Sequence, residues 1–293
     1  MDGMEELLER LVCRDTSEAG DYVREDGILM CGKCHTPKQC YAKLPVRPVK
    51  IDADGKMKMR VRLAPVSCQC RRAALERERE YDRQTQFNTW MAEQSHLYGI
   101  SGGVPKTAVF EADDGREPQA LEVCRRYVDT WPQMRQNNIG ILFCGANGTG
   151  KSFHAEMIVN ALLKKRIPSL VTSFPALLAA MEKFGEKREI VNHLRLFELA
   201  VIDDLGAERD SSYALEQVFN VIDARYRQKK PLIVTTNILY ETLKNETDPK
   251  YKRIYERVVE MCPIVVSMNT GRRRAEIARE KKRLAESILK GVM

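Results

Sequence analysis

The 293-residue chain has no apolar run long enough to cross a bilayer, and it contains no internal repeat and no low-complexity tract. Its first ten residues are acidic, whereas a secretory signal starts with basic residues followed by an apolar stretch. These absences predict a protein of the cytoplasm. Apolar residues make up 43% of the chain, which excludes a wholly disordered protein and predicts one large domain with a smaller appendage.

The net charge of +7 is unevenly distributed along the chain. Residues 1–30 carry three basic and nine acidic side chains, whereas residues 271–293 carry eight basic and three acidic ones. Such asymmetry favours a polyanionic partner near the basic end, although solubility accounts for part of it. We expect weak, salt-sensitive binding of single-stranded DNA with little sequence preference.

Three parts can be distinguished from composition: residues 1–70, a helical connector and hinge at 71–117, and a main domain at 118–293. Residues 71–98 contain neither Gly nor Pro and place apolar side chains at helical spacing, which predicts a long, partly exposed helix. Further helices are expected over residues 5–14, from Pro118 to about Pro132, and over 272–289.

Beyond Asn138 the chain alternates between short apolar runs and helix-length segments. This alternation is typical of an α/β domain in which a parallel sheet is covered by helices. Five strands are expected, which gives a central five-stranded sheet. They are 139–144, 169–172, 199–202, 232–235 and 264–267.

A phosphate-binding loop follows the first of these strands. The segment 145–152 has the pattern G-x-x-x-x-G-K-[ST], which arises by chance in a chain of this length at roughly the one per cent level. Its glycines let backbone N–H groups point at phosphate oxygens, while Lys151 supplies a charge and the Ser152 hydroxyl can ligate magnesium. The expected nucleotide-binding residues are Gly145, Ala146, Asn147, Gly148, Thr149, Gly150, Lys151, Ser152 and Phe153.

Two adjacent carboxylates, Asp203 and Asp204, end the third expected strand. Beside a phosphate loop, Asp203 is expected to join Ser152 in holding magnesium, and Asp204 to orient or activate the attacking water. Taken alone, the two aspartates would more simply cap the next helix. Asn237 closes another apolar strand; its amide can hold the same water, or it can be a turn former.

The motifs taken together resemble the DnaC/DnaI-type helicase loaders, which are AAA+ ATPases related to the IstB transposition helpers. The resemblance covers roughly residues 118–280, and its most discriminating parts are an Asp-Asp-Leu-Gly-x-Glu run and an Arg-x-x-x-Arg helix near the basic end. The motifs are 145–152, 201–208, 235–237 and 253–262.

The resemblance implies an AAA+ fold in which the strand before Asn237 is inserted between those carrying Lys151 and Asp203. It also implies ATP hydrolysis at a subunit interface, where an arginine finger enters the neighbouring copy's site. Arg257 matches the finger best and Arg253 second. A nucleotide-sensing arginine would follow Gly271, and Arg274 is preferred over the adjacent Arg272 and Arg273.

The sequence departs from many AAA+ enzymes at Asp204, where those enzymes carry glutamate after the aspartate. The shorter side chain predicts slow hydrolysis, which suits a switch.

Five of the nine cysteines lie between residues 31 and 70. Cys31 and Cys34 form a knuckle around Gly32, and Cys68 and Cys70 follow, so the four thiolates predict a tetrahedral zinc site in a small, loop-rich module. His35 or Cys40 can replace one ligand, and free or redox-active thiols are the alternative. The module is also basic, but Tyr41 is the only aromatic residue among its lysines and arginines, so base stacking there has little support.

Amino-terminal zinc modules also occur in some DnaI-like loaders, which implies that residues 1–98 contact the helicase. The sequence therefore predicts an ATP-dependent loader of a DnaB-type replicative helicase, with ATP, Mg²⁺ and Zn²⁺ as cofactors and self-association through the ATP site. The alternatives are an IstB-like transposition helper, a P-loop small-molecule kinase, and a zinc-bearing adaptor that binds ATP without hydrolysing it.

Overall fold

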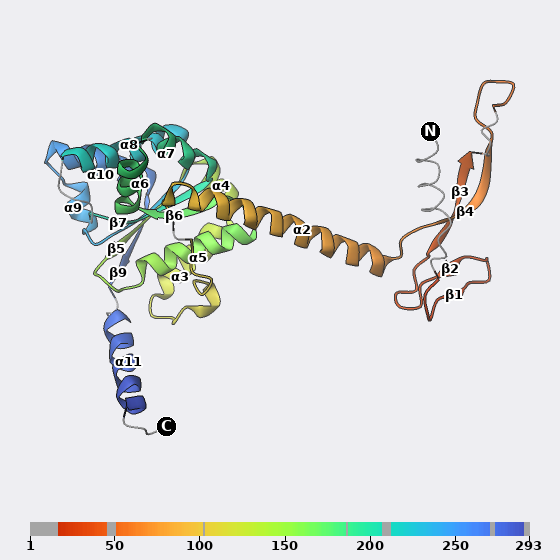
Figure 1. Ribbon diagram of the computed structural model, residues 1–293, viewed down its shortest axis with the longest axis horizontal. Coiled ribbons are helices and arrows are strands. Elements are labelled where there is room, and N and C mark those ends of the chain that lie inside the picture. The colour runs from red at the N-terminus through yellow and green to blue at the C-terminus, as the bar shows by residue number, and fades with distance from the viewer. Residues whose placement is uncertain are drawn as a thin grey trace. The chain divides into compact units, whose positions relative to one another are not determined.

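The computed structural model describes residues 17–45, 51–101, 103–185, 187–206, 212–269 and 273–289, with only the backbone of residue 44 and of 273–277. The chain divides into two compact units, Met1–Thr85 and Gln86–Met293 (Figure 1). The expected helix at 5–14 and Cys13 lie outside the described residues.

A five-stranded parallel sheet forms the centre of the second unit, as the sequence predicted. The strand order is β6-β7-β8-β5-β9, so β8 lies between the strands that precede Lys151 and contain Asp203. This is the inserted-strand order that the resemblance implied, and the domain has the AAA+ P-loop fold. The strands are β5 (Ile141–Gly145), β6 (Ser169–Ser173), β7 (Leu199–Leu205), β8 (Leu232–Thr236) and β9 (Ile264–Met268).

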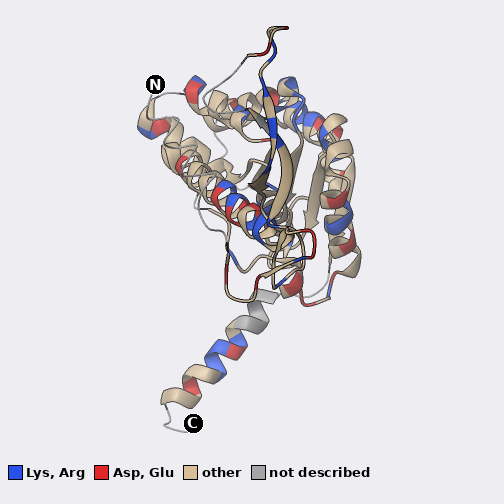
Figure 2. Ribbon diagram, turned by 90° about the vertical axis from the view of Figure 1, so that its right-hand side faces the viewer, with Lys and Arg blue, Asp and Glu red and all other residues tan. Residues whose placement is uncertain are grey.

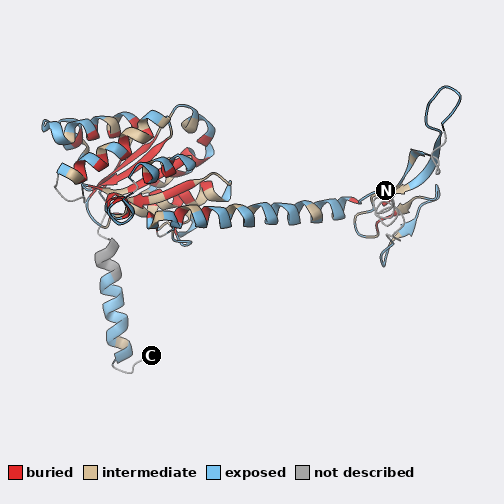
Figure 3. Ribbon diagram, turned by 45° about the horizontal axis from the view of Figure 1, so that its top comes forward, coloured by how far each residue is buried: buried red, intermediate tan, exposed pale blue. Residues whose placement is uncertain are grey.

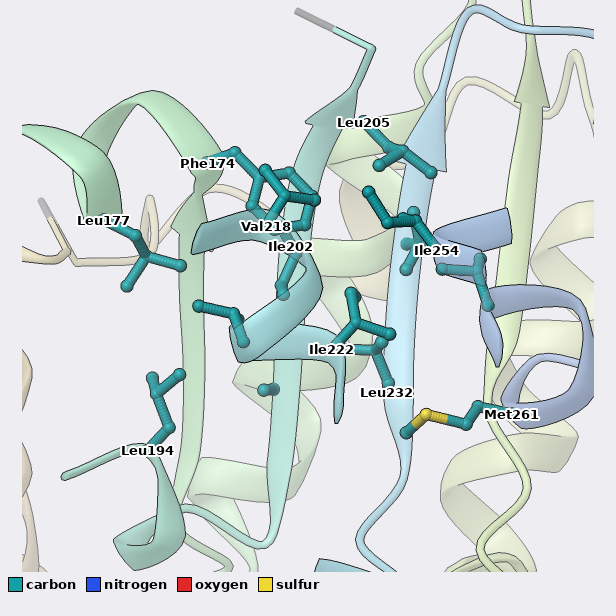
Figure 4. Packing of buried hydrophobic residues seen from close by; sticks show 14 of the residues in the cluster. Phe174, Leu177, Leu194, Ile202, Leu205, Val218, Ile222, Leu232, Ile254 and Met261 are labelled. Atoms are coloured by element: carbon teal, nitrogen blue, oxygen red, sulfur yellow. The ribbon is translucent and has the colours of Figure 1, made fainter. Parts of the chain in front are cut away.

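Both faces of the sheet are buried, which explains why its strands are continuous apolar runs (Figure 3). Alternate residues enter two separate clusters: Leu142 packs on one face with α8 (Ser212–Gln228) and α10 (Pro249–Met261), while Phe143 packs on the other with α5 (Lys151–Lys164). Figure 4 shows Ile202 and Leu232 of the sheet against Val218, Ile222, Ile254 and Met261 of these helices.

Helix boundaries follow local capping signals. The Ser173 hydroxyl accepts a hydrogen bond from the Ala176 N–H at the start of α6 (3.3 Å), and Asp248 caps α10 through the Lys250 N–H (2.9 Å). Helix α6 ends at Gly185, whose φ of 69° is the left-handed conformation that glycine adopts readily. The other helices of this unit are α3 (Pro118–Asp129), α4 (Trp131–Gln136), α6 (Phe174–Phe184), α7 (Lys187–His193), α9 (Tyr240–Lys244) and α11 (Arg273–Leu289).

Arg225 of α8 is a fully buried charge at the amino-terminal edge of the sheet. Its guanidinium donates to four backbone carbonyl oxygens, those of Leu194, Phe197, Glu198 and Pro231, at 2.7 to 3.2 Å. Burial lowers the pKa of Arg225 to about 9, which still leaves it charged at neutral pH. One side chain therefore joins the segments that lead into β7 and β8.

The long helix predicted over residues 71–98 is α2 (Gln69–His96), followed by a 3₁₀ turn at Leu97–Gly99. Its last turns belong to the second unit, where Met91 is buried and the Gln94 carbonyl lies 2.8 Å from His193 Nε2. Most of the preceding residues are exposed. Helix α11 is exposed over 278–289 apart from half-buried Ser287, with basic and acidic residues along it (Figure 2).

The first unit contains a two-stranded ribbon that the sequence analysis did not predict. Strands β3 (Gln39–Pro45) and β4 (Met59–Pro65) pair antiparallel, beside the short strands β1 (Tyr22–Val23) and β2 (Leu29–Met30). The missed signal is the strict alternation of apolar and basic residues over 59–63. It places Tyr41, Met59, Val61 and Leu63 on one exposed face of the ribbon.

Candidate functional site

The phosphate-binding loop, residues 145–152, connects β5 to α5 as the sequence predicted. Gly145, Gly148 and Gly150 have φ values of 148°, 82° and 102°, which side chains other than glycine rarely adopt. A Cβ atom at Gly145 would lie 2.1 Å from the Met268 carbonyl oxygen of β9, so the sheet itself requires glycine there. The loop therefore has the curled backbone that a phosphate cradle needs.

Lys151 is buried and joins the loop to the end of β8. Its Nζ donates to the carbonyl oxygens of Gly145 (2.8 Å) and Ala146 (3.0 Å) and to Asn237 Oδ1 (2.7 Å). Asn237 directly follows β8, the strand beside β5. The structure thus brings together the two residues that the sequence assigned to the phosphate and to the water, across 86 positions of chain.

Ser152 and Asp203, the expected magnesium ligands, are in direct contact. The Ser152 hydroxyl lies 2.8 and 3.0 Å from the two carboxylate oxygens of Asp203, and the Thr235 hydroxyl donates to Asp203 Oδ1 at 2.5 Å. A hydroxyl and a carboxylate are oxygen ligands of the kind that Mg²⁺ prefers beside phosphates. The residues present therefore fit a magnesium ion.

A β-bulge in β7 contains both carboxylates, Asp203 and Asp204. Ile202 pairs with Val234 and Leu205 with Thr236, so three steps along β7 oppose two along β8. In a regular strand, consecutive side chains point to opposite faces, and the bulge changes this alternation. Asp204 has a φ of 57° and its N–H donates to Thr235 Oγ1 at 3.0 Å. Both aspartates consequently reach the nucleotide side of the sheet.

A cavity of about 480 Å³ lies over the phosphate loop. Lys151, Ser152, Phe153 and Asp204 line it together with two residues of the segment before α3. Those two residues, Ala112 and Asp114, were not singled out from the sequence. The volume of the cavity lies in the range of small-molecule binding sites.

Glu156 lines this cavity as a third acid, beside Asp114 and Asp204, and sequence reasoning missed it. It lies one helical turn after Ser152 on α5 and is half-buried. Burial, and secondarily the charge of Asp203, raise the pKa of Glu156 to about 7. The available signal was its i, i+4 spacing from Ser152, which puts both side chains on one face of the helix.

The candidate finger residues, Arg253 and Arg257, lie on α10, about a hundred residues after the phosphate loop in the sequence. Arg257 Nη2 is 2.7 Å from Asp223 Oδ1 of α8, and both arginines border a cavity of about 350 Å³. Arg253 is exposed. Arg272 lies outside the described residues. Arg273 and Arg274 are the first residues of α11, and only their backbone is described.

The four predicted cysteine ligands come together in the first unit. The Sγ atoms of Cys31, Cys34, Cys68 and Cys70 all lie within 4.8 Å of one another. Four thiolates bound tetrahedrally at about 2.3 Å would have sulfurs roughly 3.8 Å apart, so the cluster fits zinc. A hydrogen bond from the Thr36 hydroxyl is the main cause that lowers the pKa of Cys34 to about 5, which supplies thiolate at neutral pH.

Neither alternative zinc ligand belongs to the cluster. Cys40 is exposed on β3, and the His35 ring packs against Tyr22. The knuckle is fixed by Asp21, which accepts from the Gly32 N–H (3.0 Å) and pairs with buried Lys38 (2.6 Å). The Lys38 ammonium holds the pKa of Asp21 down to about 2.

No protein-family model matches the chain, but individual proteins of known role are similar to it. The replicative helicase loader DnaC of Escherichia coli strain K12 is 28% identical over 123 residues, which cover 40% of this chain and 49% of that protein. The chain is similar to replicative helicase loaders. The loader DnaI of Bacillus subtilis strain 168 is 23% identical over 167 residues, covering 52% of this chain and 54% of that protein.

This chain thus spans about half the length of the curated loaders it matches. A crystal structure of the DnaC helicase loader superimposes with a TM-score of 0.49 and 20% identity, covering 57% of this chain and 98% of that one. Within the described residues, no helix combines the length and apolar character needed to span a membrane.

Proposed function

We propose that this chain is a cytoplasmic, ATP-dependent loader that places a DnaB-type replicative helicase on single-stranded DNA at the start of replication. The observation that carries the proposal is the contact of Lys151 with Asn237 beside the Ser152–Asp203 pair, in a chain similar to replicative helicase loaders. A phosphate loop, an acidic strand end and a polar residue on the strand between them are the parts needed to bind and hydrolyse ATP.

Each residue has one task in the proposed hydrolysis. Lys151 holds the outer phosphates, and it must exchange the Gly145 and Ala146 carbonyls for them when ATP enters. Ser152 and Asp203 would hold Mg²⁺, which supplies charge neutralisation between the phosphates. Asp204 accepts the proton of the attacking water while Asn237 holds that water in line.

The site is completed by a neighbouring copy of the chain. Arg257 of that copy, or Arg253 in second place, stabilises the charge that develops on the transferred phosphoryl group. Arg274 of the subunit's own α11 would sense the nucleotide. ATP therefore promotes self-association, and hydrolysis or contact with DNA releases the helicase.

The amino-terminal part would hold the helicase. The Cys31, Cys34, Cys68 and Cys70 cluster, with zinc bound, would fix a module whose described residues include few buried apolar side chains. Residues 1–98 are assigned to this contact.

Partner capture tests the loading role. The protein is immobilised with ATP and Mg²⁺ and exposed to a lysate of its host, in parallel with Lys151→Ala and with a chain that lacks residues 1–98. We expect a hexameric replicative helicase to be retained by the intact chain and lost on truncation. Retention of a transposase would instead establish the transposition helper.

Phosphate release tests the reaction itself. We expect ATP hydrolysis that single-stranded DNA stimulates and that leaves no phosphorylated small molecule, because no acceptor other than water is involved. A phosphorylated product would establish a kinase. ATP binding without phosphate release would establish the adaptor.

A further inference from the structure

Among the described residues, Arg257 forms an ion pair with one carboxylate, that of Asp223. Its Nη2 forms an ion pair at 2.7 Å with Asp223 Oδ1, which is buried and has no hydrogen-bond partner within the described residues, and Asp223 is only 13% exposed. The guanidinium carbon lies 4.4 Å from the centre of the Phe219 ring and 5.6 Å from that of Tyr226. Phe219, Asp223 and Tyr226 occupy positions i, i+4 and i+7 of α8, so one stripe of this helix receives the arginine.

The same contacts leave one amino group of Arg257 without a partner. Nη1 is buried and has no hydrogen-bond partner in the described part of the chain. A buried guanidinium N–H without an acceptor is costly, and an anion that reaches it removes that cost. Arg257 also borders the cavity of about 350 Å³ that lies between α8 and α10.

Charged side chains of both signs surround Arg257. Asp223 also forms an ion pair with Arg227, whose Nε lies 2.8 Å from Asp223 Oδ2 and whose side chain is 76% exposed. One carboxylate thus faces two guanidinium groups, so it cannot neutralise both. Arg253, on the same cavity, has no ion pair within the described residues, and Glu256 and Glu260 line that cavity as well, so two positive and two negative side chains border it.

We propose that Asp223 is a positioning residue for Arg257: it fixes the guanidinium through Nη2 and leaves Nη1 for the terminal phosphate of an ATP bound by a neighbouring copy. This inference rests on the proposed function. The aromatic rings of Phe219 and Tyr226 restrict the guanidinium plane, because a cation stacks on the face of a ring. The arginine therefore reaches the neighbouring site with little conformational freedom left to lose.

Mixed assemblies test this inference, because the arginine and the phosphate belong to different copies. Arg257→Ala serves as acceptor, with an intact nucleotide site and no finger. Asp204→Asn serves as donor, with a finger and no hydrolysis of its own. Each alone should release little phosphate, and an equimolar mixture should restore release.

The donor is then altered at Asp223. We expect Asp204→Asn/Asp223→Ala to restore release about tenfold to a hundredfold less well, as a misplaced catalytic group does. The substitution should lower the maximal rate of phosphate release and leave the half-saturating ATP concentration unchanged, because the acceptor's nucleotide site is unaltered. Asp204→Asn/Arg227→Ala is the matched control and should restore release fully, since Arg227 shares the carboxylate but not the cavity.

Each remaining outcome is decisive. Equal restoration with and without Asp223 overturns the positioning role, and faster restoration does so as well, since Asp223 would then restrain the arginine. If the unaltered donor restores nothing, the arrangement across two copies fails, and this inference fails with it. Asp223→Asn, which keeps the shape of the side chain, should show the same loss with an unchanged melting temperature, which separates positioning from misfolding.

Discussion

At the scale of single residues, the bulge at Asp203 and Asp204 determines which acids can serve the site. Asp204 has a φ of 57°, and aspartate and asparagine are the side chains other than glycine that tolerate this left-handed region best. Glutamate lacks the short side chain that hydrogen-bonds its own backbone there. The aspartate found where many AAA+ enzymes have glutamate is therefore explained by the backbone.

Substitutions at Asp204 should separate chemistry from stability. We expect Asp204→Asn to lower single-turnover phosphate release by about a hundredfold or more, because a positioned general base contributes at least that much. Its free energy of unfolding should change little, since asparagine accepts the same φ. Asp204→Glu should lower the free energy of unfolding by about 1 kcal/mol. Unchanged release by Asp204→Asn would remove Asp204 from the mechanism.

Glu156 makes the free energy of unfolding of the nucleotide-free protein depend on pH. Its pKa is raised from 4.5 to about 7, so the folded state binds a proton that the unfolded state releases. The stabilisation is complete below pH 4.5 and is lost as pH rises through 7. Glu156→Gln, measured by denaturant unfolding, should gain about 1 kcal/mol over the parent between pH 5 and pH 8, after allowance for solvent screening. An identical pH dependence in both proteins would contradict this.

The phosphate loop, Asp203 and Asn237 were predictable because each stands at the end of an apolar strand and carries a recognisable side chain. The proximity of Glu156 to Asp203 was not predictable from the sequence, because it depends on how closely α5 approaches β7. The Arg257–Asp223 pair was missed for the same reason: it joins two helices that the sequence places far apart.

At the scale of elements, the five sheet strands were predicted within a few residues because burial on both faces makes them continuously apolar. Their order came only from the resemblance, since parallel pairing joins segments that no local pattern relates. The ribbon of β3 and β4 was missed because its residues are mostly exposed, and a solvated ribbon has no buried face to strengthen its alternation.

Arg225 offers a test of how the elements are joined. Arg225→Lys should lower the free energy of unfolding by about 3 kcal/mol or more, because one ammonium cannot reach carbonyls spread over a guanidinium and would leave buried acceptors unpaired. Chemical denaturation monitored by circular dichroism measures the change. Arg227→Lys is the matched control two positions away and, being exposed, should change it by less than about 0.5 kcal/mol. Equal effects would refute the role of Arg225.

At the scale of the whole molecule, the two units rely on different sources of stability. The second unit has two apolar clusters on either side of its sheet, whereas the buried apolar residues described in the first unit are Met30, Cys31 and Cys68. The predicted division at residues 70 and 117 remains a prediction.

Metal removal should therefore affect the units unequally. We expect one zinc per chain, and we expect a chelator to expose residues 17–85 to proteolysis while ATP binding by the second unit persists. Cys31→Ser should reproduce the effect, and Cys40→Ser should not, because Cys40 is exposed on β3 and lies outside the cluster. Intact protection after the metal is stripped would show that thiolates do not hold the module.

The strand order also bears on how the chain matures on the ribosome. Strand β5 ends at Gly145, yet its two neighbours are β8 and β9, which end at Thr236 and Met268. Until those strands have left the exit tunnel, β5 has no partner on either side and the phosphate loop has no fixed ends. We therefore expect a nascent chain to bind nucleotide only after β9, which ends at Met268, has emerged and paired with β5.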